Sequence, residues 1–523
     1  MNKPQGTPRE HRSAGLQLFR RALILMAFLV LLLVLLLLRP LGHVLKTMFQ
    51  DQDQRSRLVA GTIDDASRLN LSDVSGVRLV ESDLSEEQLA LMLAEARDSG
   101  FRVSIAGARH SMGGHTIYPG GISIDMSGWN RMEMSPGGDV LTVQSGARWH
   151  DVIAFLDANQ RSVAIMQSND SFSVGGSLSV NCHGWQYGKP PIASTVLSMR
   201  VMLADGSVVR CSRDENAELF SLVLGGYGLF GIILDADLST VPNEIYQLEQ
   251  HVVSTGEAFG TLDDELLVNP EIEMVYARMN VSKDDFLGKL IINGFIRRPG
   301  DPERLDSISH DGRLEHVLLG TKRVVFRGSE GSEYGKWLRW NAETRVAPAL
   351  RGTTFTRNQL LDEGVETLEN RSAETTDILH EYFVPRERAG GFLDSVRRIV
   401  RDHEADLLNV TIRQVDVDMD TMLRYADGPM IAFVMLFLQD RNAEGEAGME
   451  AMTRELIEAS LENEGRYYLP YRLHATRQQF NRAYPARKEF FELKRSYDPD
   501  ELFQNEFYLK YGRDDSPIDS NGK

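Results

Sequence analysis

Residues 22–38, ALILMAFLVLLLVLLLL, form an unbroken apolar run, and this run constrains the chain more than any other feature. As a helix it would be about 25 Å long, which is at the short end for crossing a bilayer. The following sequence, RPLGHVLKTMFQ, offers no small-x-small cleavage site of the kind that ends a signal peptide. The run therefore predicts an uncleaved N-terminal transmembrane helix.

The charges that flank this run predict its orientation. Basic side chains precede it at Lys3, Arg9, Arg12, Arg20 and Arg21. An excess of basic residues marks the cytoplasmic side of a membrane helix, so we expect a cytoplasmic N-terminus. The rest of the chain has no second run of this length. We therefore expect a single-pass protein of the inner membrane, with its catalytic domain outside the cytoplasm.

The composition excludes several classes of protein. The chain has 57 basic and 75 acidic residues, a net charge of −18, which argues against nucleic acid as a partner. Its two cysteines, Cys182 and Cys211, cannot form a disulfide scaffold or a four-cysteine zinc site. The histidines of the H-x4-H pair, His110 and His115, have no carboxylate or cysteine at a usual ligand spacing, so no metal site is expected.

Changes in the pattern of apolar and polar residues divide the chain into six parts. A strand near residues 77–80, a capping box at residues 85–88 and a second strand at residues 101–106 predict a β-α-β unit. From about residue 245 the pattern changes to longer strand-like runs that alternate with helices. The predicted parts are a cytoplasmic N-terminus with the anchor (1–48), a linker (49–72), a first domain (73–244), a second domain (245–465), a C-terminal segment (466–513) and a disordered tail (514–523).

The first domain contains three glycine-rich segments, of which the first two follow predicted strands and the third precedes one. They are GARHSMGGH (107–115), SVGGSLSVNCHG (173–184) and GGYGLFG (225–231). Such segments expose consecutive backbone N–H groups, which can bind anions. None is a G-x-G-x-x-G or Walker A loop, and a single glycine loop is usually only a turn. Together the three segments favour a large ligand that carries phosphates.

The order and spacing of these segments resemble the PCMH-type FAD-binding domain of the vanillyl-alcohol oxidase superfamily. The resemblance is nearly continuous over residues 77–242, and KRSYDPDELFQNEF (494–507) resembles the tail that returns to this domain. HSMGGH and GGISIDM are similar to cytokinin dehydrogenases, whereas HEYFVPRE (380–387) and NVTIRQVDVD (409–418) are similar to aldonolactone and alditol oxidases. The resemblance implies an α+β fold: a two-subdomain FAD-binding domain and a substrate (cap) domain with an antiparallel sheet and helices on one face.

The resemblance also implies cofactor-binding residues. The backbone of residues 107–111 would wrap the FAD pyrophosphate, and His110 would bond covalently to the flavin 8α-methyl group. Asn169 stands where some members have a second linking cysteine, so a double linkage is not expected. The residues implied to hold FAD are Gly107, Ala108, Arg109, His110, Ser111, Ser173, Gly175, Gly176, Ser179, His183, Gly184, Ile232, Ile233 and Asn505.

Three further residues are implied to take part in catalysis. Asp170 resembles the aspartate base of cytokinin dehydrogenases, and Arg413 resembles the arginine near flavin N1 in alditol and lactone oxidases. His474 stands where that branch has a lysine, and its near-neutral pKa suits a base. The lysine-to-histidine change argues against sugar-alcohol activity.

These features leave three functions open. The first is oxidation of a CH–OH group of a small molecule such as a sugar lactone or polyol. The second is CH–NH oxidation, as in cytokinin dehydrogenases, and the third is a flavin-binding module without turnover. Oxygen or a quinone would accept the electrons. Cys182 replaces the smaller residue that oxidases of the superfamily often have before the His-Gly pair, which favours a dehydrogenase.

Overall fold

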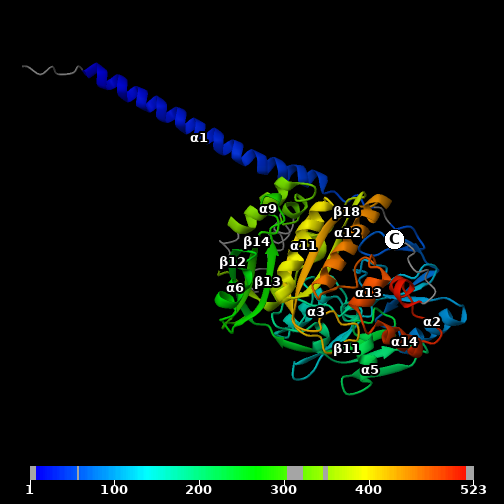
Figure 1. Cartoon of the computed structure of the whole chain (residues 1–523). Coiled ribbons are helices and arrows are strands. Elements are labelled where there is room, and N and C mark those ends of the chain that lie inside the picture. Colours follow the sequence, from blue (N-terminus) through cyan, green and yellow to red (C-terminus); the bar gives the residue numbers. More distant parts are fainter. Residues whose placement is uncertain (1–7, 56–57, 303–304, 306–321, 346–351, 514–523) are drawn as a thin grey trace, which may run out of the picture.

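The computed structural model describes residues 8–55, 58–302, 305, 322–345 and 352–513, and within the first helix the side chains of residues 19–28 and 38–50. The tail predicted for residues 514–523 lies outside the described residues. The body contains two parts, one built from residues before about 244 and one from the residues that follow, and a long helix projects from it (Figure 1). This mixed α/β architecture is consistent with an FAD-binding domain that carries a cap.

The helix α1 (Pro8–Gln50) contains the apolar run and ends against the body. Near its C-terminal end, His43 Nε2 lies 2.8 Å from the Gly328 carbonyl oxygen, and the Arg39 guanidinium lies 4.1 Å from the centre of the Tyr334 ring. When only residues with described side chains are counted, no helix has both the length and the hydropathy needed to cross a bilayer. The side chains of residues 29–37, in the middle of the run, are not among them.

The first part of the body contains two main sheets. One is parallel, in the order β3-β5-β4, and the other is antiparallel, in the order β10-β9-β11-β7-β6 with β8 pairing to β11. There is accordingly no single continuous parallel sheet among the described residues. The elements are β1 (Thr62–Ile63), β2 (Ser72–Asp73), β3 (Gly76–Glu81), α2 (Glu86–Asp98), β4 (Val103–Ala106), β5 (Ile122–Gly128), β6 (Met132–Met134), β7 (Val140–Gln144), α3 (Trp149–Asp157), β8 (Arg161–Val163), α4 (Val174–Val180), β9 (Val196–Met202), β10 (Val208–Ser212), α5 (Ala217–Val223) and β11 (Ile232–Pro242).

Local sequence accounts for several of these boundaries. The Ser85 hydroxyl accepts a hydrogen bond from the Gln88 backbone N–H, and the Gln88 side chain caps Ser85 in return, which begins α2 as predicted. The predicted strands of the β-α-β unit, β3 and β4, do not pair with each other. Each pairs in parallel with β5, which lies between them.

The second part of the body is an eight-stranded sheet in the order β15-β12-β14-β13-β17-β18-β16-β19, with antiparallel pairs throughout. α11 and α12 pack on one face, where Tyr382 contacts Phe392. The elements are β12 (Ile245–Ser254), α6 (Ala258–Thr261), β13 (Ile272–Met279), β14 (Lys289–Arg298), α9 (Glu333–Arg345), β15 (Thr354–Thr356), α10 (Arg357–Leu361), β16 (Thr375–Pro385), α11 (Ala389–Asp402), β17 (Leu407–Val415), β18 (Met430–Asp440), α12 (Ala443–Glu462) and β19 (Arg466–Tyr467).

The C-terminal segment crosses back to the first part of the body. After α13 (Arg477–Ala483) and α14 (Arg487–Tyr497), Phe503 forms a parallel bridge with Val103 of β4. The Val103 N–H donates to the Leu502 carbonyl at 2.8 Å, and the Gln504 N–H donates to the Val103 carbonyl at 2.9 Å. Residues 502–504 therefore extend the parallel sheet of the first part.

Candidate active site

A cavity of about 2840 Å³ lies between the two parts of the body. Residues of all three glycine-rich segments line it from one side. The face of the cap sheet that α11 and α12 do not cover lines it from the other. Three residues other than glycine have positive φ in these segments: Arg109 at +56°, Asn181 at +49° and Tyr227 at +54°. Such left-handed conformations are uncommon outside glycine and mark sharp turns of the chain.

The first two glycine-rich segments contact each other closely. A Cβ on Gly107 would lie 2.2 Å from Ser173 Oγ, and the Ala108 N–H donates to that oxygen at 3.3 Å. A Cβ on Gly175 would lie 2.6 Å from Ser145 Cβ. A larger residue at Gly107 would push the two segments apart, and a larger residue at Gly175 would push the second segment away from Ser145 at the end of β7.

Most of the predicted cofactor-binding residues line this cavity. They are Gly107, Ala108, Arg109, His110, Ser111, Ser173, Gly175, Gly176, Ser179, His183 and Ile233. Gly184 and Ile232 are not in the lining, and Ile232 packs in the hydrophobic core instead. Asn505 is also outside the lining; its amide donates to the carbonyls of His115 and Tyr227 at 2.9 and 2.8 Å and so holds the C-terminal segment in place.

Unpartnered polar atoms test whether a polar cofactor fits. The hydroxyls of Ser111, Thr116 and Ser145 are buried at the cavity and have no hydrogen-bond partner among the described residues. The same holds for Nε of Arg413. Each buried polar group left unpaired costs about 1–3 kcal/mol. The cavity therefore fits a large ligand with many polar atoms, and FAD is such a ligand.

His110 presents a neutral imidazole to this cavity. Its ring packs against Phe172, with 4.4 Å between ring centres. Burial, with a smaller contribution from the nearby Arg148 guanidinium, lowers the pKa of His110 to about 4. The ring is therefore uncharged near neutral pH.

A buried acid–histidine pair stands on the cap side of the cavity. His183 Nε2 lies 2.5 Å from Glu381 Oε1, and both side chains are 3% exposed. The Tyr471 hydroxyl donates to Glu381 Oε2 at 3.1 Å. Burial, together with Glu381, raises the pKa of Tyr471, so this phenol stays protonated. Sequence reasoning overlooked Glu381 and Tyr471, although Glu381 lies within the motif HEYFVPRE.

Arg413 of β17 lies beside this pair. Its Nη2 donates to Ser168 Oγ at 2.8 Å, and its Nη1 donates to the His183 carbonyl at 3.5 Å. With its Nε unpartnered among the described residues, Arg413 has donor capacity left for a ligand. The structure thus brings together Arg413 and His183, two residues that the resemblance had singled out separately.

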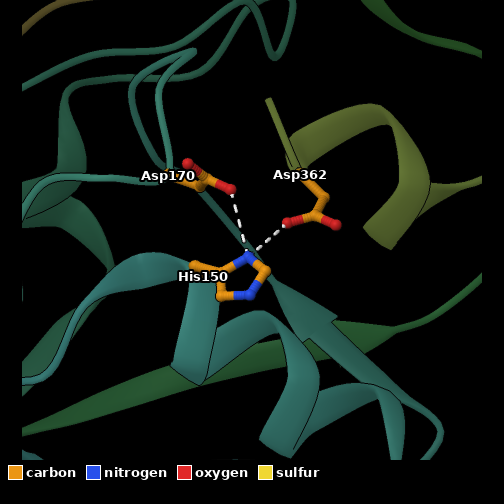
Figure 2. Close-up of side chains that lie close together, drawn as sticks. All are labelled: His150, Asp170 and Asp362. Atoms are coloured by element: carbon orange, nitrogen blue, oxygen red, sulfur yellow. Dashed lines mark hydrogen bonds and ion pairs between the residues drawn. The ribbon is translucent and has the colours of Figure 1, made fainter. Parts of the chain in front are cut away.

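Asp170 lines the cavity within a cluster of three side chains (Figure 2). His150 Nδ1 lies 3.3 Å from Asp170 Oδ2 and 2.9 Å from Asp362 Oδ1. Burial and the neighbouring Asp362 raise the pKa of Asp170. The ligand atoms of the three residues lie within 4.8 Å of one another, which is close enough to surround a cation. Residue spacing gave no indication of this cluster, because Asp362 is distant in sequence from His150 and Asp170.

His474 lies outside the cavity lining. Its Nε2 is 2.9 Å from Glu446 Oε1, and its Nδ1 is 3.0 Å from the Thr453 hydroxyl of α12. α12 covers the sheet face opposite the cavity, and both imidazole nitrogens are engaged there. The structure therefore does not bring His474 together with Glu381 and Arg413.

Comparisons with known proteins agree with this geometry. Residues 84–212 match the family described as FAD binding domain. The chain is 29% identical to an uncharacterized oxidoreductase of the fasciation locus of Rhodococcoides fascians, over 46% of this chain and 56% of that protein. It is 25% identical to cytokinin dehydrogenase 7 of Oryza sativa subsp. japonica, over 77% of this chain and 80% of the relative. It is also 29% identical to D-arabinono-1,4-lactone oxidase of Yarrowia lipolytica, over 32% of this chain and 33% of the relative.

The first part of the body thus contains an FAD-binding domain. The similarity to FAD-linked oxidoreductases of the vanillyl-alcohol oxidase superfamily is confirmed, with relatives among both cytokinin dehydrogenases and aldonolactone oxidases.

Proposed function

We propose that this protein is a membrane-anchored FAD-dependent oxidoreductase that oxidises a CH–OH group of a sugar lactone, a polyol or a related alcohol. The buried pair Glu381–His183 beside Arg413 is the observation that carries this proposal. It would offer an acceptor for a hydroxyl proton and a cation at the same cavity that the glycine-rich segments line.

The cradle residues would hold the cofactor. The backbone of residues 107–111 and the hydroxyls of Ser111 and Ser145 would bind its polar groups, and the ring of His110 would carry the covalent bond. When bound, FAD supplies an acceptor for the hydride that leaves the substrate carbon.

Glu381 would accept the proton of the substrate hydroxyl. A general base must lie within hydrogen-bond reach of the proton that it takes, and Glu381 lines the cavity. His183 and Tyr471 contact its two carboxylate oxygens and fix its orientation.

Arg413 would stabilise negative charge. A fixed guanidinium in a site from which water is excluded stabilises developing anions more strongly than it would in water. Its contact with the His183 carbonyl holds it next to the proposed base. This arrangement supports the same role for Arg413 that its sequence motif implies.

A second candidate is oxidation of a CH–NH bond. Asp170 lines the same cavity, and its raised pKa allows it to hold a proton nearer neutral pH than an ordinary aspartate does. Several relatives are cytokinin dehydrogenases. In this alternative Asp170, rather than Glu381, would contact the reacting group.

A donor screen separates the two candidates. The full-length holoenzyme is mixed without oxygen with polyols, aldonolactones or secondary amines, and the bleaching of the flavin absorption band is followed. The proposal expects bleaching by an alcohol or a lactone. Bleaching by amines alone would favour the second candidate.

The anchor proposal rests on residues 22–38 and predicts a change in solubility. Deleting residues 1–38 should release a flavoprotein that remains in solution without detergent, because the apolar run is lost. The truncated chain keeps the contacts that Arg39 and His43 make with the body.

Deleting residues 1–48 serves as the comparison, since it removes those contacts as well. Sedimentation of both truncated chains with membranes would show that another surface binds lipid. For orientation, a reporter fused after Lys523 should be active outside the cytoplasm, and activity only in the cytoplasm would reverse the proposed topology.

The electron acceptor is tested at Cys182. Its thiol donates to Gln167 Oε1 at 3.0 Å, and burial raises its pKa to about 12, so it fills part of the cavity wall as a neutral thiol. We expect slow reoxidation of the reduced flavin by oxygen in the wild type. In Cys182→Gly reoxidation should be roughly tenfold faster, because a close-packed interior changes when even one heavy atom is removed.

Stopped-flow mixing with aerated buffer measures this rate. Cys211→Gly is the matched control, because Cys211 is buried in the core away from the cavity. Fast reoxidation of the wild type that the glycine leaves unchanged would indicate an oxidase.

A further inference from the structure

The cap end of the cavity holds two arginines to which neither the sequence motifs nor the proposed mechanism gives a role. Arg278 of β13 and Arg339 of α9 both line the cavity. Arg278 Nη1 donates to Glu343 Oε1 at 2.8 Å, while Arg339 Nε lies 3.7 Å from the same oxygen. One carboxylate therefore faces two guanidinium groups.

Other acidic groups do not complete the neutralisation of this pair. Asp406 is nearby, but its Oδ1 lies 2.6 Å from Lys336 Nζ. Glu363 interacts with Arg278 only as a weaker, more distant charge. Burial lowers the pKa of Arg339 to about 10, which still leaves it cationic at neutral pH. At this end of the cavity the two guanidinium groups thus share one nearby carboxylate, that of Glu343.

Both arginines also have unused donors. Arg278 Nε and Arg339 Nη1 are buried and have no hydrogen-bond partner among the described residues. Arg339 is only 5% exposed, and its remaining group, Nη2, donates to the Leu408 carbonyl at 2.6 Å. Buried guanidinium N–H groups form their strongest hydrogen bonds with carboxylate or phosphate oxygens. The unpaired donors therefore point to an anionic ligand.

The register of the cap sheet connects this cationic end to the proposed base. Arg278 pairs with Thr411, Thr411 with Val434, and Val434 with Glu381, so that one row crosses four strands. All four residues line the cavity. Three strand spacings separate the ends of the row by about 14 Å. Arg413, two residues after Thr411 on the same strand, lies on the same face between these ends.

We propose that Arg278 and Arg339 form an anion subsite that binds a carboxylate or phosphate group of the substrate. The substrate is then an acidic alcohol whose anionic group lies within about 14 Å of the carbon that is oxidised. This inference rests on the proposed function for the identity of the reacting group. The subsite itself rests on the charges and unpaired donors of the cap.

The test measures anion binding without turnover. The full-length holoenzyme, in which FAD already occupies the cradle, is titrated calorimetrically with inorganic phosphate and, separately, with acetate. We expect saturable binding of one anion per chain. Arg278→Gln should weaken this binding at least tenfold, which corresponds to about 1.4 kcal/mol, and Arg278→Lys should retain part of it.

Arg386→Gln is the matched control. Arg386 pairs with Asp263 at the surface and does not line the cavity, so its substitution should leave binding unchanged. Saturable binding of phosphate alone identifies a phosphorylated substrate, and saturable binding of acetate alone identifies a carboxylated one. Absence of saturable binding of both anions, or wild-type affinity in Arg278→Gln, would overturn the subsite. Anion binding without flavin bleaching by any alcohol would leave the subsite standing and refute the proposed function.

Discussion

Replacing Glu381 with glutamine should leave the protein folded and loaded with FAD but slow flavin reduction by the substrate about 10²–10⁴-fold, the usual contribution of a general base. The amide has nearly the same shape, so it can still contact His183 and Tyr471. It cannot accept the hydroxyl proton, however, and the hydride then has to leave a neutral alcohol.

Anaerobic stopped-flow reduction measures this effect directly. Glu387→Gln is the matched control. Glu387 is exposed just beyond the end of β16, so this substitution removes the same charge from the same region. A variant Glu381→Gln that reduces its flavin at the wild-type rate would exclude Glu381 as the base. The corresponding variant Asp170→Asn would then test the CH–NH candidate.

Replacing His110 with alanine should abolish covalent attachment of the flavin completely. The wild-type chain should stay yellow and fluorescent after denaturation in acid, because a bond to the ring nitrogen survives unfolding. The variant should release its flavin on denaturation. It should still bind FAD while folded, since the close contact between Gly107 and Ser173 does not involve the imidazole.

Fluorescence of the denatured chain on a gel reports the bond. His403→Ala is the control, because His403 pairs with Glu455 on the outside of the cap and does not line the cavity. Flavin that leaves the denatured wild-type chain entirely would contradict the attachment, and residual fluorescence in His110→Ala would assign the bond to another residue.

The sequence predicted those parts of the site that depend on local backbone chemistry. Gly107 is needed where the first segment touches Ser173 of the second, and most of the glycines and serines predicted to bind the cofactor line the cavity. Arg413 was found for a similar reason, because it belongs to a short motif within one strand.

Pairings between distant residues could not be predicted in the same way. His183 and Glu381 are 198 positions apart, and only the position of β16 beside the FAD-binding domain brings them together. Within HEYFVPRE, strand alternation sends Glu381 into the cavity, while His380 and Tyr382 face α11 and α12. Without the sheet register, the sequence gives no means of choosing between the two faces.

His474 shows the opposite case. It stands at the position of a lysine in the motif and was predicted to act as a base, but the Glu446 carboxylate and the Thr453 hydroxyl contact both of its nitrogens on the helical side of the sheet. β12, the first strand of the cap sheet, begins at Ile245, where the pattern of the sequence changes to longer strand-like runs.

We propose above all that an alcohol is oxidised in the cavity between the FAD-binding domain and the cap. Anaerobic titration of the purified full-length holoenzyme with a panel of neutral, phosphorylated and carboxylated alcohols tests it most directly. The account predicts about one FAD per chain and complete bleaching of the flavin by at least one acidic alcohol. A chain that takes up no FAD, or a fully loaded flavin that no alcohol reduces, would contradict it.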